Sequence, residues 1–122
     1  MKTLAQIRAA NALKAAKQPN MGIGQKGGDA LSSFPMLIIT DGLLATLAYA
    51  VERKPDGQRK NPGALLVANA IAEHLSSPGI RIVKASDADS LVEELANADS
   101  ATIRRATSET LAFLNYLKRF TA

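Results

Sequence analysis

The stretch ATSETLAFLNYLKRF, residues 106–120, carries the clearest helical pattern in this chain of 122 residues. Its large apolar side chains recur every three or four positions, the spacing that places residues on one face of an α-helix. The pattern extends back to residue 100 and predicts a helix over 100–120. The residues predicted to face a hydrophobic core are Ile103, Ala106, Thr110, Phe113, Leu114 and Leu117.

The rest of that predicted helix is basic or hydrogen-bonding. Arg104, Ser108, Asn115 and Arg119 lie roughly opposite the core face, with Arg105 and Lys118 at the flanks. Glu109, one turn beyond Arg105, is expected to pair with it. Such a face either is solvated or meets the phosphates of a nucleic acid, and composition favours neither. Aromatic residues make up only 4% of the chain, so we expect any nucleic-acid contact to be with the backbone rather than by base stacking.

Alanine and leucine dominate the rest of the chain, and the alternation typical of strands is absent. We therefore predict an all-α fold, a compact helical bundle of about six helices in a single domain over 1–122. The other helices are expected over 3–17, 29–33, 36–53, 62–76 and 90–97. The stretch IRIV, 80–83, is a candidate for a short extended segment. The helix over 36–53 is apolar on nearly every side and should form the centre of the core.

Several residues predict how these helices begin and pack. Pro35 suits the first turn of a helix, where its missing N–H is not needed. Gly42 inside a helix costs about 1 kcal/mol relative to alanine, which indicates close contact with another helix at that point. Asn61 is expected to cap the helix over 62–76. Ser90 followed by Glu93 predicts a capping box.

The first predicted helix should pack through small residues on one face, which allow another helix to approach closely. The residues of that face are Ala5, Ala9, Ala12, Leu13 and Ala16. Arg8, Lys14 and Lys17 lie outside it.

Charge is unevenly distributed along the chain. The formal net charge is +4 and the isoelectric point is about 9.6, which permits nucleic-acid binding without requiring it. Residues 1–60 carry nine basic and four acidic side chains, residues 61–99 two and six, and residues 100–122 four and one. An acidic middle between basic ends would favour self-stacking or a basic partner, although an ordinary solvated surface explains the same pattern.

Composition excludes several kinds of site. The chain has no cysteine, which excludes disulfides, thiolate metal sites and cysteine nucleophiles, and its single histidine, His74, excludes a multi-histidine metal site. The longest apolar run, 36–51, is too short and too polar to span a membrane convincingly. The start, MKTLAQIRAA, lacks the apolar core of a signal peptide, so we expect a cytoplasmic protein.

Three features resemble catalytic or ligand-binding motifs only superficially. The stretch GIGQKGG, 22–28, lacks the preceding strand and the Gly-Lys-Ser/Thr ending of a phosphate-binding loop, so a flexible linker is the better interpretation. His74 next to Glu73 has no second histidine, serine elbow or oxyanion loop beside it, which favours a surface histidine or a hydrogen-bonded core histidine. The acids between 87 and 99 lack calcium-loop spacing. Asp41 either is buried with partners or faces solvent. We therefore expect no catalytic residue, no metal and no cofactor.

Two longer segments together resemble a known family. FPMLIITDGLLATLAYAVERK, 34–54, is similar to a pattern of Leu-Pro-x-Met-Ile, then Asn-Gly-Leu, then an Ala-Phe-like helix end. IRRATSETLAFLNYLKRFTA, 103–122, is similar to a Thr-x-Glu-x-Leu-Ala-Phe-Leu-x-Trp-Leu-Lys-Arg-Phe ending, and QIRAANALKAA, 6–16, fits the first helix. These patterns are those of the small α-helical subunit of the type III-B CRISPR effector, the Cmr complex.

The chain departs from the family pattern at several positions. Tyr116 stands where tryptophan is common, Asp41 where asparagine precedes the glycine, and Ile103 where tyrosine is common. The stretch before Pro35 has glycines and serines where tyrosine and basic residues are expected, which leaves Lys26 as its only cation.

The resemblance implies a non-catalytic RNA-binding subunit that stacks head to tail beside other Cmr subunits. It would lie along the duplex of CRISPR RNA and target RNA. The candidate RNA-binding residues, chosen by helical phase and charge, are Lys14, Lys17, Lys26, Arg104, Arg105, Lys118 and Arg119. Two other functions stay open: a protein-only helical adaptor without RNA contact, and a small hydrolase built around His74.

Overall fold

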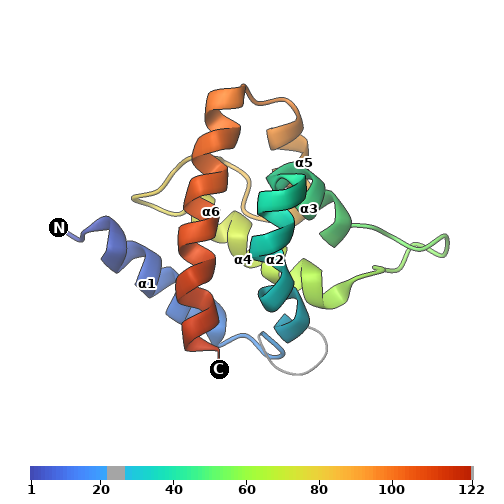
Figure 1. Cartoon of the computed structure of the whole chain (residues 1–122), viewed down its shortest axis with the longest axis horizontal. Helices are drawn as coiled ribbons and strands as arrows, with labels where there is room; N and C mark the ends of the chain where they lie inside the picture. The colour runs from blue at the N-terminus through green and yellow to red at the C-terminus, as the bar shows by residue number, and fades with distance from the viewer. Residues whose placement is uncertain (22–26, 122) are drawn as a thin grey trace.

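The computed structural model describes residues 1–21 and 27–121, which contain six helices (Figure 1). They are α1 (Leu4–Ala16), α2 (Gly27–Asp41), α3 (Leu43–Ala50), α4 (Pro62–Ser76), α5 (Ala88–Ala96) and α6 (Ser100–Phe120). The described residues contain no strand, only an isolated bridge between Arg53 and Arg59. This confirms the all-α fold. The stretch 80–83 forms no strand, and Arg81 within it has a positive φ of 46°.

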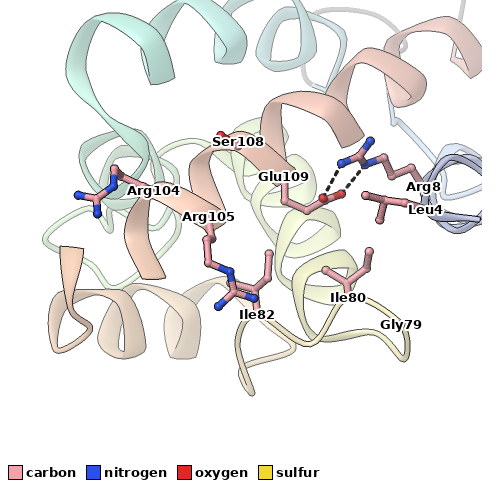
Figure 2. A pocket seen from close by; sticks show the side chains of 9 residues that line it. All are labelled: Leu4, Arg8, Gly79, Ile80, Ile82, Arg104, Arg105, Ser108 and Glu109. Carbon is pink, nitrogen blue, oxygen red and sulfur yellow. Dashed lines mark hydrogen bonds and ion pairs between the residues drawn. The ribbon is translucent and has the colours of Figure 1, made fainter. Parts of the chain in front are cut away.

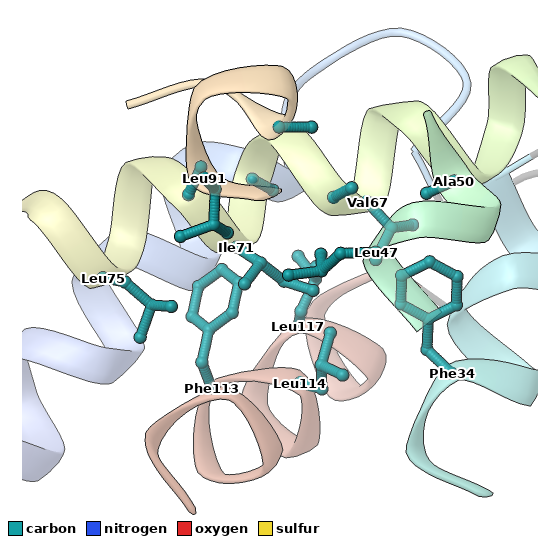
Figure 3. Packing of buried hydrophobic residues seen from close by; sticks show 14 of the residues in the cluster. Phe34, Leu47, Ala50, Val67, Ile71, Leu75, Leu91, Phe113, Leu114 and Leu117 are labelled. Carbon is teal, nitrogen blue, oxygen red and sulfur yellow. The ribbon is translucent and has the colours of Figure 1, made fainter. Parts of the chain in front are cut away.

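The core is centred on α4 and α6, which pack against each other and against several other helices (Figure 3). Apolar side chains from five helices meet there with at most 1% of their surface exposed; among them are Phe34, Leu47, Val67, Ile71, Leu75, Leu91, Phe113, Leu114 and Leu117. The predicted core face of α6 is confirmed, with Ile103 only partly buried. The prediction that 36–53 would form the centre is only partly right. Ile38, Leu43, Leu47 and Ala50 are buried in the core, but Met36 and Ile39 are 66% and 69% exposed.

The single helix predicted over 36–53 is in fact split at Gly42. Gly42 has φ +95°, a conformation that glycine adopts without the steric penalty of a Cβ atom. A Cβ atom built on Gly42 would meet nothing within 4 Å, so the predicted close helix contact is wrong and the backbone angle is the reason for glycine. α2 begins at Gly27, so Pro35 lies inside α2 rather than in the first turn of a helix. Residues 29–33, predicted as a separate short helix, belong to α2 as well.

Two of the predicted helix starts also need correction. α5 is capped by Asp87, whose side chain accepts a hydrogen bond from the Ser90 N–H at 2.9 Å, so the predicted Ser90–Glu93 capping box does not form. Asn61 precedes α4, as expected, but its side chain donates to the carbonyl of Tyr49 at 2.9 Å instead of capping the helix.

The face through which α1 packs agrees only in part with the one predicted. Ala12 and Ala15 are buried, whereas Ala5 is exposed and Leu13 is about half exposed. The side of α1 that faces the bundle also carries Arg8, because that guanidinium pairs with a carboxylate of α6. The small-residue pattern alone could not show this polar anchor.

Candidate nucleic-acid interface

The four basic residues of α6 are exposed, as the helical phase predicts: Arg104, Arg105, Lys118 and Arg119. Among the described residues, no carboxylate lies within ion-pairing distance of any of them. The Asp99 side chain caps α6 by accepting from the Thr102 N–H at 2.8 Å, and this hydrogen bond lowers the pKa of Asp99. The RNA-binding role of the four cations stays a prediction.

Two further candidates lie on α1, which packs mainly against α6 although the two helices come from opposite ends of the chain (Figure 1). Lys14 lies in the last turn of α1 and Lys17 is its C-cap, and both are exposed. Positive charge there is favourable because the carbonyl end of a helix carries partial negative charge. The seventh candidate, Lys26, lies outside the described residues, as does most of the glycine-rich stretch 22–28.

Glu109, the one acid of α6, points into the protein rather than toward Arg105. Its carboxylate accepts two hydrogen bonds from Arg8 of α1, from Nε and Nη2, both at 2.8 Å, and lies 2.8 Å from Nε2 of His74 of α4. The predicted Glu109–Arg105 pair is therefore wrong. Since this carboxylate is neutralised from inside, the outer surface of α6 carries only positive formal charge.

His74 is sealed in the junction of α1, α4 and α6, with 1% of its surface exposed. Asn11 Nδ2 lies 2.9 Å from His74 Nδ1 and donates to Ser77 Oγ at 2.9 Å. Ser77 Oγ donates its only hydrogen to the carbonyl of His74 at 2.7 Å, so toward Asn11 it can only accept. The NH₂ group of the Asn11 amide therefore points toward Ser77 Oγ and His74 Nδ1. Nδ1 therefore accepts, and Nε2–H donates to Glu109, so His74 is neutral.

The stacking of His74 against Phe113, at 4.3 Å between ring centroids, completes its enclosure. Of the two alternatives, a surface histidine and a hydrogen-bonded core histidine, the structure therefore shows the core histidine. A hydrolase built around His74 finds no support in this geometry. The relevant acid is Glu109, distant in sequence, and not the neighbouring Glu73.

The burial of this junction shifts the pKa values of both titrating partners. Burial lowers the pKa of His74 below its ordinary 6.5, and the attraction of Glu109 only partly opposes this. Burial alone would raise the pKa of Glu109, but hydrogen bonds from Arg8 and His74, together with their charges, outweigh it and lower the pKa below 4.5.

We expect the folded protein to lose stability as the pH falls below about 6.5. The unfolded chain binds a proton on His74 more readily than the folded chain does, so this contribution is fully present above 6.5 and declines as the pH drops from there toward the lower folded pKa. Urea unfolding at about pH 7.5 and about pH 5.5 measures the effect, since His74 is the only histidine. A His74→Gln variant should show a smaller difference between the two pH values. An equal difference in both proteins would contradict the assignment.

Sequence reasoning missed Arg8, Asn11 and Ser77 as members of this junction. Arg8 and Asn11 both lie on α1, far in sequence from Glu109 and His74, so no local spacing relates them to these two residues. Ser77 follows His74 by only three residues, and its hydroxyl donates to the His74 carbonyl. The sequence did hint at a buried polar junction, because His74, the one histidine, and Glu109, the one acid of α6, both lie beside core positions of their helices.

A hollow of about 450 Å³ opens between α1, α6 and the loop after α4; we call it the α1–α6 hollow (Figure 2). Its lining residues are Leu4, Arg8, Gly79, Ile80, Ile82, Arg104, Arg105, Ser108 and Glu109. It therefore combines exposed guanidinium groups and a hydroxyl with an aliphatic surface.

The remaining candidates for chemistry do not assemble into a site. Asp41 is exposed, so the solvent-facing alternative holds. No group of three or more potential metal-ligating side chains occurs in residues 1–21 and 27–121. None of the helices described is long and apolar enough to cross a membrane.

Comparison with known proteins decides the family. Residues 4–122 match the family described as CRISPR-associated protein (Cas_Cmr5). The chain belongs to the Cmr5 family. A Cmr5 family protein from Thermus thermophilus, known from an X-ray crystal structure, is 27% identical, with a TM-score of 0.71 over 99% of this chain and 96% of that one. No curated protein matches the chain significantly.

Membership of the Cmr5 family confirms the resemblance based on segments 34–54 and 103–122. This chain is thus a small helical CRISPR-associated protein of the Cmr type. The exposed cations of α1 and α6 and the α1–α6 hollow are its candidate interaction features.

Proposed function

We propose that this Cmr5 family chain is a non-catalytic small subunit of the type III-B CRISPR effector, a cytoplasmic ribonucleoprotein for antiviral defence. Its role is to stack in a filament and to stabilise the pairing of guide RNA with target RNA. The observation that carries the RNA contact is the outer surface of α6, where four cations are exposed while Glu109 is turned inward. Such a surface attracts phosphates without reading bases.

Seven residues are proposed to contact RNA or to hold it electrostatically: Lys14, Lys17, Lys26, Arg104, Arg105, Lys118 and Arg119. The packing of α1 on α6 supports treating the described six as one basic region. Binding should weaken steeply with salt, because each phosphate contact releases counterions.

Head-to-tail stacking is supported by an exposed apolar pair on α2 and an exposed leucine on α1, which have opposite charges beside them. On α2, Met36 and Ile39 are exposed, and Asp29 lies two turns before Met36 on the same face. On α1, Leu13 is exposed, with Lys17 one turn beyond it. Two different complementary surfaces form a heterologous contact, which repeats from copy to copy rather than closing a symmetric pair.

The absence of catalysis is proposed from what the titratable residues do in the fold. His74 and Glu109 hold three helices together, and their side-chain hydrogen bonds are directed inward. We therefore propose that target cleavage and other enzymatic steps belong to other Cmr subunits, with no metal or cofactor held by this chain.

Reversing two charges on α6 is expected to weaken target RNA retention. An effector reconstituted with guide RNA and the Arg104→Glu/Arg119→Glu chain should release matching target RNA at least about tenfold more readily, because two phosphate contacts become repulsive. Filter binding at two salt concentrations measures this. The matched control is Arg53→Glu/Lys54→Glu, the same charge change on the exposed loop between α3 and α4.

The outcomes separate the competing functions. Normal incorporation with unchanged RNA retention would place the RNA surface elsewhere on the chain. Incorporation that is independent of RNA, with no RNA binding by the chain, would favour the protein-only helical adaptor, for which the exposed apolar surface of α2 is the supporting observation. Failure to join the effector would overturn the proposed subunit role.

A further inference from the structure

We propose that the α1–α6 hollow binds one unpaired nucleotide of single-stranded RNA, with its phosphate at Arg105 and Ser108. This inference rests on the proposed RNA contact and assigns it one site. It adds residues that helical phase and charge did not select: Ser108 and the aliphatic residues of the loop after α4.

The charge of the hollow favours an anion. Glu109 lies on its wall, but the Glu109 carboxylate oxygens are occupied by Arg8 and His74, and 8% of the side chain is exposed. The Arg8–Glu109 pair cancels its own charge and leaves Arg104 and Arg105 uncompensated among the residues that line the hollow. Arginine and hydroxyl groups together are well suited to a phosphate, because they donate several hydrogen bonds to its oxygens.

The size and the apolar surface of the hollow favour a nucleotide over an acidic side chain. The hollow is open to solvent and has a volume of about 450 Å³, so a carboxylate on one or two methylenes would cover only part of its surface. Leu4, Ile80 and Ile82 supply an aliphatic surface, and the Arg105 side chain extends toward Ile82 (Figure 2). A sugar and base can lie on that surface while the phosphate meets the guanidinium.

The loop after α4, which forms one wall of the hollow, is held in place before any ligand arrives. The Ile82 N–H donates to the carbonyl of Leu75 at 3.0 Å, and the Ile80 N–H donates to the carbonyl of Ser77 at 3.1 Å. Gly79 has φ +91° and lies so close to Ile7 of α1 that a Cβ atom would be 2.8 Å from Ile7 Cδ1. The loop side of the hollow therefore binds without the cost of ordering it, and that cost is confined to exposed side chains such as Arg105.

Binding of fluorescent 5′-phosphorylated tetrauridylate to the isolated chain tests the site directly. Arg105→Gln removes the proposed phosphate donor and should weaken binding about tenfold, the loss expected for one charged hydrogen bond. Ser108→Trp fills the hollow without changing the charge and should weaken binding by at least as much. Thermal unfolding of each variant shows that it is folded.

The matched controls carry the same substitutions away from the hollow. Arg53→Gln changes an exposed arginine of the loop between α3 and α4, and Ser86→Trp changes an exposed serine before α5. Both should bind tetrauridylate like the original chain. Equal binding by all four variants, or equal weakening in controls and hollow variants, would overturn the site.

A competitor distinguishes RNA from an acidic protein partner. Hexaglutamate, added at the same total concentration of negative charge as unlabelled tetrauridylate, should displace labelled tetrauridylate poorly. If it displaces the label as effectively as unlabelled tetrauridylate does, the nucleotide assignment is overturned. Effector incorporation, measured separately, keeps the two proposals apart. If the chain binds tetrauridylate in the hollow but joins no effector, the nucleotide site stands and the subunit role is overturned. If the chain joins the effector but the hollow variants bind tetrauridylate as well as the original chain does, the subunit role stands and the nucleotide site is overturned.

Discussion

Replacing Glu109 with alanine is expected to lower the free energy of unfolding by about 3 kcal/mol. The substitution removes the acceptor of two hydrogen bonds from Arg8 and of the Nε2–H of His74. His74 is left with a buried Nε2–H donor that has lost its acceptor, while Arg8, 24% exposed at its side chain, can turn partly into the α1–α6 hollow. This escape keeps the loss below that of a fully enclosed ion pair.

Urea unfolding and differential scanning calorimetry measure the effect, which should lower Tm by roughly 10 °C for a chain of this size. Glu93→Ala removes an exposed carboxylate from α5 and serves as the matched control, with an expected change within about 0.5 kcal/mol. Glu109→Gln separates charge from volume: its carbonyl can accept only part of the network, and its NH₂ group would face the Nε2–H of His74. Losses no larger than that of the control would mean that the network does not hold α1 to the bundle.

Phe113→Ala should be the most destabilising single substitution considered, with a loss of about 4 kcal/mol. Phe113 is 1% exposed and lies among the core side chains of α4 and α6 (Figure 3). Its ring stacks on that of His74, with ring planes 12° apart. Alanine there leaves a cavity and also opens one side of the buried histidine. The stacking adds a smaller contribution to that of the buried area.

The matched control is Phe120→Ala, the same change on the same helix at a residue that is 39% exposed. Its loss of unfolding free energy should be less than half that of Phe113→Ala. Phe113→Leu refills most of the volume without the ring, and should recover most of the core contribution. Similar losses for the alanine variants at 113 and 120 would contradict the assignment of Phe113 to the centre of the core.

The position of the break in the predicted helix over 36–53 illustrates what local pattern cannot supply. Apolar residues continue on both sides of Gly42, so periodicity gives no boundary, and helix propensity treats a glycine as a cost to be tolerated. Only the backbone angle of +95° shows that the helix ends there and that another begins. Met36 and Ile39 face outward although they are apolar, because α2 packs on the core through a different face, which carries Leu31, Phe34 and Ile38.

The sequence by itself determined the helical class, the core face of α6 and the exposure of Arg104, Arg105, Lys118 and Arg119. These features depend on side-chain periodicity within one helix, which is read directly from residue order. Residue order also carried the family resemblance, since the motifs over 34–54 and 103–122 are contiguous.

Only the tertiary structure decided which polar groups meet. Glu109 could pair with Arg105 one turn away or with a distant cation, and both choices satisfy the helical pattern. The packing of α1 and α4 on α6 places Arg8 and His74 at the buried side of that carboxylate, where hydrogen bonding is strong enough to exceed a solvent-exposed pair within one helix. This pairing of Glu109 with Arg8 and His74 directs the carboxylate inward and leaves the outer surface of α6 cationic. It also makes the Arg8–Glu109 pair part of the wall of the α1–α6 hollow.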